Sequence, residues 1–383
     1  MKNNRLLVVT TSYPVTKKSI SGIFVKRLND ALSEYFEIRV VCPAGIECNS
    51  EGNISQARYA PRKLQILAHQ AGGIPVALRE NKLIGLLVPI MLLSILFTTF
   101  INLRKSNKII AHWSINGVIA GFCNLFYNRP LITVFHGTDA NAVGSSIVKT
   151  LLALLAIKLS DRVVGVSESI TNSLKEHFPR YKNKIHFLSN GVEEKLFDLK
   201  PEDSDEFTFL TIANLNPLKG VADVIEAFAQ VNNKRARLLV VGDGPEKKEL
   251  EHLATKLRLT DKVEFLGVLS PDEIPHVLNN SNAFVLASYS EGRPSVILEA
   301  MASGKAILAT SLPGILEMIE PDYNGFLFSP GDTGKLTELM DALIGRPDLA
   351  ESIGCNAKQY IFDKKLTWAH TAEQYLCLFR SIA

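Results

Sequence analysis

The sequence lacks the cysteine spacings of a metal site or a disulfide framework. Its five cysteines, at positions 42, 48, 123, 355 and 377, include no Cys-x-x-Cys pair, so we expect buried thiols of a reducing compartment. No Gly-x-Gly-x-x-Gly motif follows the first apolar run, which disfavours a dinucleotide-dependent dehydrogenase. The 383 residues show no internal repeat or low-complexity tract, and 46% hydrophobic with 21% charged residues is a normal globular composition.

The N-terminal residues also lack the apolar core of a signal peptide. In "MKNNRLLVVTTSYP" only a short apolar run precedes polar Thr10, Thr11 and Ser12. That run is too short for a signal-peptide core, and it fits a first buried strand.

Acidic residues are scarce in the first half of the chain. Residues 1–190 hold 23 Lys and Arg against 10 Asp and Glu, whereas residues 191–383 hold 19 against 29. Such a split suggests that the first half faces something anionic. The basic residues are scattered, without a recognisable nucleic-acid module, so an anionic membrane surface fits at least as well as nucleic acid, and we expect no nucleic-acid partner.

Short aliphatic runs alternate with helical stretches along the whole chain. This alternation predicts an α/β fold with parallel, doubly wound sheets, in which ligands bind beyond the carboxyl ends of the strands. Asn-Gly, Pro and an acidic run in "NGVEEKLFDLKPEDSDEF" predict a domain boundary near residue 190. The runs are "RLLVVTT", "FEIRVVCP", "NKIIAHW", "PLITVFHG", "DRVVGVS" and "KIHFLSN" before it, and "EFTFLTIAN", "ARLLVVGDG", "KVEFLGV", "NAFVLAS" and "KAILATS" after it.

Residues 83–101, "LIGLLVPIMLLSILFTTFI", carry no charge and are followed by Arg104 and Lys105. Pro89 is expected to open a helix, since proline fits the first helical position. A helix over 89–101 is about 20 Å long, shorter than a ~30 Å hydrocarbon core. The segment therefore favours a buried or interface helix over a monotopic membrane contact, and both over a true span.

The stretch "EGRPSVILE" places Glu291 in a loop and Glu299 more than one turn inside a helix that starts near Pro294. A helix N-terminus attracts phosphate, and Gly292 lets a ligand approach the backbone closely. Glu299 could then accept hydrogen bonds from a ribose, with Glu291 near whatever lies beyond the phosphates. The alternative is two surface glutamates without a ligand.

Further candidates follow other predicted strands. Lys219 comes after Pro217 at the mouth of a helix, where its charge suits a diphosphate, although a solvated lysine is the simpler alternative. Gly242 ends the strand in "VVGDG", His136 ends the strand in "TVFHGTDAN", and Gly22 opens the first helix. A strand-end histidine in a loop of small residues favours a site.

These pieces, in this order, resemble the retaining glycosyltransferases of family 4, which have the two-domain GT-B fold. The resemblance runs from "TSYPVTKKSISGIFV" through "HWSINGVIAG", "FHGTDAN", "LSNGVEEKLF", "LKG" and "VVGDGPEKKEL" to "EGRPSVILEAMASGKAILATSLPGILEMI". It implies two Rossmann-like domains facing a central cleft. Residues 1–190 would bind the acceptor, with a C-terminal helix of about 364–383 packed back on them, and residues 191–363 would bind the nucleotide sugar.

The same resemblance implies roles for individual residues. Glu299 would bind the ribose of a UDP- or GDP-sugar, Lys219 the diphosphate, and Glu291 the donor sugar. His136 would meet that sugar from the first domain, and Gly22 would let a loop close over the phosphates. No metal and no cofactor is expected, because Lys219, a helix dipole and backbone amides would counter the leaving charge.

The sequence departs from the family pattern at Asn214. The family usually places an arginine there, paired with the lysine at the diphosphate, so one positive charge is missing. Asn214 can still donate hydrogen bonds to phosphate. Arg293 could replace the lost charge or read an acidic sugar, although a solvated side chain is the favoured interpretation.

The predicted function is a metal-independent hexosyltransferase that extends a polysaccharide or glycolipid, cytoplasmic and peripheral at the inner face of the membrane. Its acceptor would be a saccharide, lipid-linked in view of the charge asymmetry. Alternatives are a nucleotide-sugar epimerase of the same fold and a non-catalytic nucleotide-sugar-binding subunit. A glycoside hydrolase fits poorly, because its two acids should have matched exposure.

Overall fold

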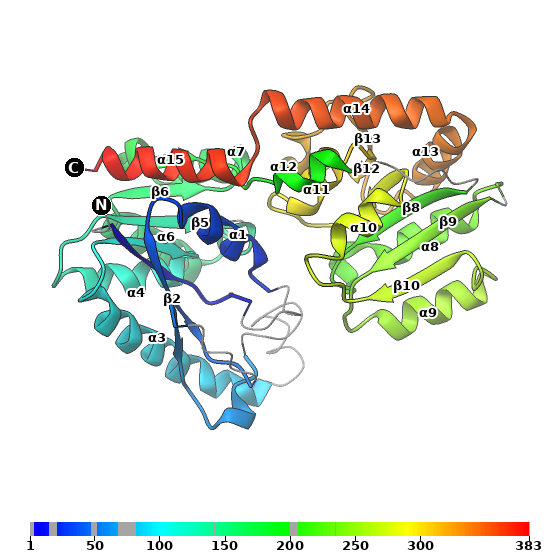
Figure 1. The fold of residues 1–383 in the computed structure, drawn as a ribbon. Helices are drawn as coiled ribbons and strands as arrows, with labels where there is room; N and C mark the ends of the chain where they lie inside the picture. The colour runs from blue at the N-terminus through cyan, green and yellow to red at the C-terminus, as the bar shows by residue number, and fades with distance from the viewer. Residues whose placement is uncertain are drawn as a thin grey trace. The chain divides into compact units, whose positions relative to one another are not determined.

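The computed structural model describes residues 4–14, 21–46, 52–67, 82–140, 142–199, 206–233 and 235–382. The chain divides into two compact units (Figure 1). The N-terminal unit comprises Met1–Asn190 and Trp368–Ala383, and the C-terminal unit comprises Gly191–Thr367. Each unit has one parallel sheet between helices, which confirms the predicted α/β class.

The N-terminal sheet has seven parallel strands in the order β3-β2-β1-β4-β5-β6-β7, so the strand order reverses between β1 and β4. Successive residues of β1 enter different cores: Leu6 and Val8 pack in one, Leu7 and Val9 in the other. Burial on both faces explains why most strands are continuous runs of apolar residues in the sequence. The strands are β1 (Arg5–Val9), β2 (Glu37–Pro43), β3 (Ile54–Ala57), β4 (Lys108–His112), β5 (Leu131–Phe135), β6 (Arg162–Gly165) and β7 (Ile185–Phe187).

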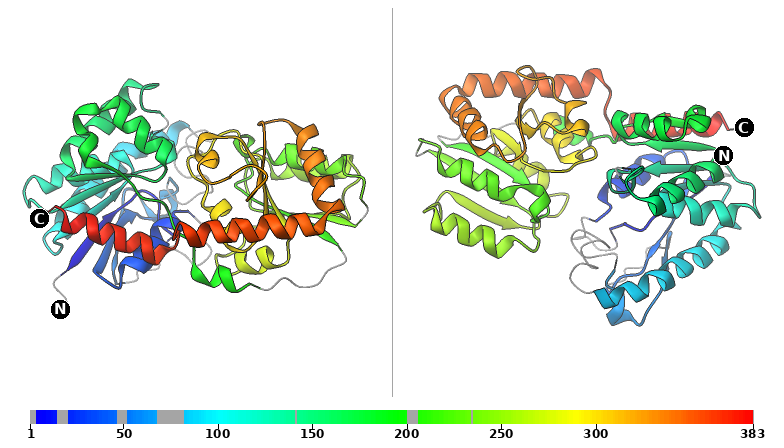
Figure 2. Two further views of the ribbon diagram at one scale, coloured as in Figure 1. Left: turned by 90° about the horizontal axis from the view of Figure 1, so that it is seen from above. Right: turned by 180° about the vertical axis from the view of Figure 1, so that it is seen from behind.

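Helices cover both faces of this sheet (Figures 1 and 2). The C-terminal helix α15 packs against α1, where Trp368, Tyr375 and Phe379 enter the core of the N-terminal unit. The helices of this unit are α1 (Ile23–Leu32), α3 (Leu87–Leu103), α4 (Ser114–Asn124), α5 (Gly137–Ala140), α6 (Ile147–Leu159), α7 (Glu168–His177) and α15 (Trp368–Arg380), with short 3-10 turns η1 (Arg62–Leu64), η2 (Lys82–Leu86) and η3 (Pro179–Lys184).

Helix α3 contains most of the long apolar segment, whose first residues lie in η2, and it packs against β1, β2 and β3. The prediction that Pro89 opens this helix is wrong, because Pro89 is its third residue and η2 precedes it directly. A proline is tolerated there because the first four N–H groups of a helix have no intrahelical partner. In the part of the chain that the structure describes, one helical segment, Ile84–Leu103, is long and apolar enough to cross a membrane by length and composition alone.

The C-terminal sheet has six parallel strands in the order β10-β9-β8-β11-β12-β13, which reverses between β8 and β11. Its strands are β8 (Phe207–Ile212), β9 (Ala236–Val241), β10 (Val263–Gly267), β11 (Ala283–Leu286), β12 (Ala306–Thr310) and β13 (Phe326–Phe328). Its helices are α8 (Val221–Ala229), α9 (Lys247–Lys256), α10 (Ile274–Asn279), α11 (Ser295–Ala302), α12 (Pro313–Leu316), α13 (Thr333–Gly345) and α14 (Pro347–Asp363), with 3-10 turns η4 (Glu194–Asp198) and η5 (Pro217–Lys219).

The structure differs from the sequence predictions at two edge strands and two cysteines. The predicted strands omitted β3 and β13, which have four and three residues and lie at sheet edges. Cys42 and Cys123 are buried as predicted, but Cys355 and Cys377 are exposed, because they lie on the outer faces of α14 and α15. Cys48 lies outside the described residues.

Candidate functional site

The carboxyl ends of β8 and β11 bring Lys219 and Glu291 together in the C-terminal unit. Lys219 ends η5 after β8, and Glu291 follows β11. The Lys219 Nζ donates to Glu291 Oε1 at 2.6 Å, and Ser288 Oγ donates to the same oxygen at 2.8 Å. The two side chains are 25% and 11% exposed. The two charges are therefore paired and partly buried, and their roles in binding a diphosphate and a sugar stay predictions.

Helix α11 begins directly after this loop, as predicted, with Pro294 as its N-cap residue. Among the residues that the structure describes, no side chain caps its first turn. The fifth residue of the helix, Glu299, is 8% exposed. A buried carboxylate one turn from an uncapped helix N-terminus is suited to a ligand that presents both phosphate and hydroxyl groups.

The loops after β8 and β9 lie against each other at the same edge. Gly242 has a φ of 136°, and a Cβ built on it would overlap the carbonyl oxygen of Ala213. Only glycine adopts such a conformation readily. Asn214 is half-buried next to this contact, and its Oδ1 accepts from Asn216 Nδ2 at 3.0 Å. The structure thus places Asn214 and Gly242 at adjacent strand ends.

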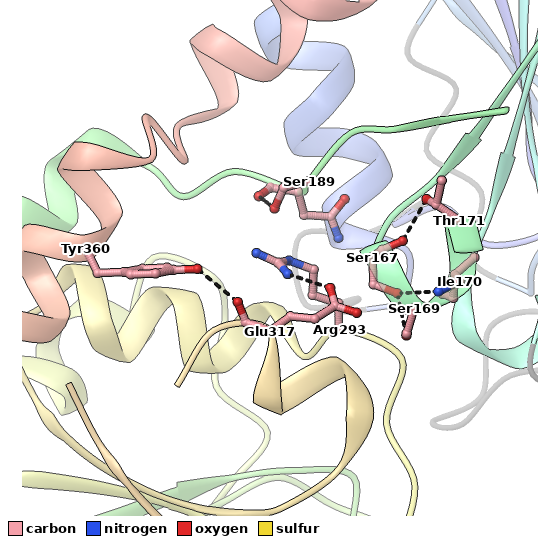
Figure 3. Close-up of polar contacts among 9 residues, drawn as sticks. Ser167, Ser169, Ile170, Thr171, Ser189, Arg293, Glu317 and Tyr360 are labelled. Atoms are coloured by element: carbon pink, nitrogen blue, oxygen red, sulfur yellow. Dashed lines mark hydrogen bonds and ion pairs between the residues drawn. The ribbon is translucent and has the colours of Figure 1, made fainter. Parts of the chain in front are cut away.

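Arg293 differs from its favoured interpretation as a solvated side chain. Its side chain is 3% exposed, and its guanidinium lies 3.3 Å from the Glu317 carboxylate (Figure 3). The hydroxyl of Tyr360 donates to the Glu317 carbonyl at 3.0 Å. Any role of Arg293 in replacing the missing arginine must therefore compete with Glu317. That role stays a prediction.

In the N-terminal unit, His136 follows β5 and lies in an aromatic cluster. Its ring centroid is 4.9 Å from Phe24 and 4.7 Å from Trp113. Its Nε2 lies 3.2 Å from His112 Nδ1. The His112 Nε2 is buried and has no hydrogen-bond partner among the described residues. Because an unpartnered N–H costs more than an unpartnered acceptor in a poorly solvated site, we assign the His112 proton to Nδ1, which donates to His136.

Three further residues of this cluster, His112, Trp113 and Asp139, were not predicted from the sequence. Asp139 joins two loops, because its carboxylate accepts from the backbone N–H of His136 at 2.9 Å and of Ser114 at 2.6 Å. Trp113 has a φ of 69°, uncommon for a bulky side chain and typical of functional loops. The available signal was the shared position of "AHW" and "FHGTD" at the ends of predicted strands.

Gly22 precedes α1, as predicted, with a φ of 71°. A Cβ on Gly22 would overlap the carbonyl oxygen of Ser12, just after β1. Gly22 therefore belongs to the loop after β1, and His112 is the last residue of β4. The order of this sheet reverses between these two strands. His136 follows the next strand, β5.

Burial sets the charge states of this cluster. It lowers the pKa of His136 to about 3, and it lowers the pKa of His112 well below its usual range, with repulsion from His136 as a second cause. Removal of the Asp139 carboxylate from water raises its pKa to about 6 against its two backbone hydrogen bonds. At neutral pH the two histidines are therefore uncharged, and Asp139 is mostly ionised.

These pKa shifts predict acid sensitivity of the N-terminal unit. Below pH 6.5 the unfolded state protonates both histidines, whereas folded His136 stays uncharged down to about pH 3 and burial also lowers the pKa of folded His112. The free energy of unfolding therefore decreases as the pH is lowered, by up to about 1.4 kcal/mol per pH unit for each histidine. Asp139 has the opposite effect between about pH 6 and 3.8. Its carboxyl group binds a proton more tightly in the folded state than in the unfolded state, so its protonation stabilises the fold as the pH is lowered. Both tryptophans, Trp113 and Trp368, lie in this unit, so their fluorescence during urea unfolding reports it selectively.

The His136→Gln variant should show a shallower pH dependence between pH 6.5 and 5 than the wild type. Because both proteins keep Asp139, its contribution cancels in the comparison. His252→Gln, at an exposed position of α9, is the control and should retain the wild-type slope. Identical slopes for all three proteins would contradict the assigned charge state of His136.

The close approach of two glycines fixes the loop that carries Glu291. A Cβ on Gly314, in α12, would overlap the Gly292 carbonyl oxygen. Gly314→Ala should therefore destabilise the C-terminal unit by about 1–3 kcal/mol, the usual cost of overpacking. Circular dichroism should show the loss while tryptophan fluorescence stays unchanged. Gly345→Ala, which meets nothing within 4 Å, is the control, and equal stability of both variants would show that the contact does not constrain the loop.

Two family profiles match almost the whole chain. The family described as Glycosyl transferases group 1 matches residues 192–360, and Glycosyltransferase Family 4 matches residues 22–196. An N-acetyl-alpha-D-glucosaminyl L-malate synthase of Bacillus anthracis is 32% identical over 244 residues, which are 61% of this chain and 63% of that protein. An alpha-monoglucosyldiacylglycerol synthase of Streptococcus pneumoniae is 28% identical over 56% of this chain and 47% of its own length. The matched region thus spans less than two thirds of either relative.

A solved structure extends the comparison over the full chain. HepE of Anabaena, in complex with UDP and glucose, superposes with a TM-score of 0.77 at 20% identity, covering 99% of this chain and 100% of that one. At this identity the likeness shows the fold alone, and it confirms the predicted two-domain, Rossmann-like GT-B fold. With that fold and both family profiles, the chain belongs to the group 1 glycosyltransferases of family 4.

Proposed function

We propose that this chain is a retaining hexosyltransferase that moves a sugar from a UDP- or GDP-sugar to a lipid-linked saccharide in polysaccharide or glycolipid synthesis. One observation carries the proposal: Lys219 and Glu291 follow β8 and β11, the strands between which the sheet order reverses, and they pair at 2.6 Å. In open α/β sheets, ligands bind at this point. The names of the Bacillus and Streptococcus relatives, a glucosaminyl malate synthase and a glucosyldiacylglycerol synthase, support sugar transfer.

The donor would lie along the carboxyl edge of the C-terminal sheet. Glu299 would accept hydrogen bonds from the ribose, and the first turn of α11 would face the diphosphate. Lys219 would leave Glu291 in part and turn its charge to the phosphates, while Glu291 would accept from a hydroxyl of the donor sugar. Gly242 and Asn214 would let the nucleotide approach the backbone of the adjacent loops. The ion pair therefore holds two ligand groups ready in the unliganded protein.

The proposed reaction proceeds on one face of the sugar. The bond from the anomeric carbon to the diphosphate oxygen breaks as the acceptor oxygen bonds to the same carbon from the leaving-group side. The acceptor hydroxyl proton passes to the departing diphosphate, so the anomeric configuration is retained. Lys219 and backbone N–H groups would stabilise the charge on the leaving group, so we propose that no metal is needed.

The N-terminal unit would supply the acceptor side and His136. With Nε2 of His136 accepting from His112, its Nδ1 carries the proton and can donate to a sugar oxygen. The low pKa of His136 keeps this group a neutral donor at physiological pH. Gly22 would let the loop after β1 approach the phosphates. We further propose that the protein works in the cytoplasm, at the inner face of the membrane.

A thermal-shift panel of nucleoside diphosphates and nucleotide sugars tests the donor assignment. A selective rise in Tm should identify one nucleotide, because a ligand that binds only the folded state stabilises it. Glu299→Ala should abolish this rise, with an affinity loss of about tenfold or more, because the ribose loses a charge-assisted hydrogen bond.

Glu338→Ala, an exposed position on α13, is the matched control and should keep the full rise. Glu299→Gln preserves the volume of the side chain and separates a binding defect from a folding defect. If Glu299→Ala and Glu299→Gln both retain the rise, the ribose assignment is wrong. If no nucleotide raises the Tm of the wild type, the donor proposal itself fails.

Asn214 favours one alternative, a non-catalytic nucleotide-sugar-binding subunit that has lost its diphosphate arginine. Asn214→Arg should tighten nucleoside diphosphate binding about tenfold, the usual effect of one charge-assisted hydrogen bond. Asn232→Arg, on the exposed surface after α8, controls for added charge. Isothermal titration calorimetry measures both. A catalytic protein should bind donor without the change, whereas binding that appears only in Asn214→Arg would favour the non-catalytic alternative.

A further inference from the structure

The exposed apolar side chains of the N-terminal unit are concentrated on one layer of helices. Among the described residues, 21 large hydrophobic side chains are exposed, and 13 of them lie between Leu86 and Leu155. They lie on α3 and the residue before it, on the end of α4 and the two residues after it, and on α6. Helix α3 packs beside α4, and α4 beside α6 (Figure 1). A concentration of this kind marks an interaction surface, since isolated exposed apolar residues are normal but contiguous ones are not.

Helix α3 shows the pattern most clearly. Its exposed side chains follow a spacing of three and four residues, which places them on one side of the helix. The opposite side, which includes Met91, Ile95 and Leu103, is buried against the sheet. The exposed stripe consists of Leu86, just before the helix, and Ile90, Leu93, Phe97 and Ile101, with exposed Leu96 beside it.

The neighbouring helices continue this surface. Phe122, Leu125 and Phe126 are exposed at the end of α4, and the Phe126 ring lies 5.7 Å from Phe100 of α3. Helix α6 exposes Ile147, Val148, Leu151 and Leu155, while Ala153, Ala156 and Ile157 are buried. We call the exposed apolar side chains of α3, α4 and α6 together the outer apolar face.

The charged residues in this part of the chain are almost all basic. Residues 81–160 contain seven Lys and Arg but one acidic residue, Asp139, and the Asp139 carboxylate binds two backbone N–H groups. Arg104 and Lys105 are exposed just beyond α3, and Lys149 and Lys158 are exposed on α6. By contrast, α1, α7 and α15, the other long helices of this unit, all carry acidic residues.

This combination of apolar and basic groups matches the surface of an anionic bilayer. Apolar side chains enter the boundary between headgroups and acyl chains, and basic side chains attract anionic lipids. A second copy docked on the same face would bring like charges together, which disfavours self-association. A transmembrane span would remove Met91, Ile95 and Leu103 from the core that they share with β1 and β4. The helix therefore fits a contact along the membrane plane.

We propose that the outer apolar face docks this protein on an anionic lipid bilayer, with α3 and α6 lying along the membrane surface. This inference rests on the proposed transfer to a lipid-linked acceptor, because docking would bring the enzyme to the surface where that acceptor lies.

Vesicle sedimentation tests the docking face. At low salt the full-length protein should sediment with vesicles of equal parts phosphatidylglycerol and phosphatidylcholine, and much less with phosphatidylcholine alone. Leu93→Ser with Phe97→Ser, at side chains 66% and 65% exposed, should lower partitioning about tenfold, since each loses apolar contact with the membrane. Arg104→Gln with Lys105→Gln should lower it about tenfold at low salt and little at high salt.

Two matched controls are available. Leu64→Ser removes a side chain that is 51% exposed but lies outside the outer apolar face, and Lys248→Gln with Lys256→Gln removes two exposed charges from α9. Both should sediment like the wild type.

Equal recovery of the wild type with anionic and neutral vesicles, or equal loss in the control variants, would overturn the proposal. So would sedimentation velocity showing a dimer that Leu93→Ser with Phe97→Ser dissociates. The thermal shift with nucleotide sugar should be the same in all surface variants. Loss of sedimentation with an intact thermal shift therefore separates the docking face from the donor site, whereas intact sedimentation without any thermal shift would reject the proposed function alone.

Discussion

The constraint on which the rest depends is that both sheets are parallel and buried on both faces. A parallel strand must be followed by a crossover connection, usually a helix, that returns the chain to the start of the next strand. The carboxyl ends of all strands in a sheet therefore meet at one edge. Where the strand order reverses, the connections after two adjacent strands leave the sheet in opposite directions, and a crevice forms between them. Lys219 and Glu291 follow the two strands at the reversal of the C-terminal sheet. At the reversal of the N-terminal sheet, Gly22 lies in the loop after β1 and His112 ends β4. The strand order of each sheet therefore determines where the candidate site residues lie.

Close contacts between backbone segments hold the loops of the candidate site in place. Gly242 and Gly314 let neighbouring loops touch where a Cβ would overlap a carbonyl oxygen, that of Ala213 and that of Gly292. Asp139 ties the loop after β4 to the loop after β5 through two backbone N–H groups, which holds His136 beside His112. These contacts restrict the loops in the absence of ligand, and such preorganisation reduces the cost of ordering a site when ligand binds.

The parallel α/β class and the position of most strands could be predicted from the sequence. A strand that is buried on both faces consists mostly of aliphatic residues, and such runs are easy to recognise. The sequence was insufficient for β3 and β13, whose few residues carry little periodicity. Arg293 was misread because its partner, Glu317, is 24 positions away and no local pattern joins them. The same limit hid the exposed stripe of α3: a helix that is apolar on all sides has no sequence signal for which side faces the sheet. Only the packing of Met91, Ile95 and Leu103 on the strands shows it.

Helix α15 gives the chain an uneven order of assembly. The C-terminal unit is one continuous segment, Gly191–Thr367, whereas the core of the N-terminal unit needs Trp368, Tyr375 and Phe379, which follow that segment. During synthesis, the second unit can therefore close on itself before the first has received its last packing helix. The unit translated first is completed last, and until then its surface under α15 stays open to the surroundings of the ribosome.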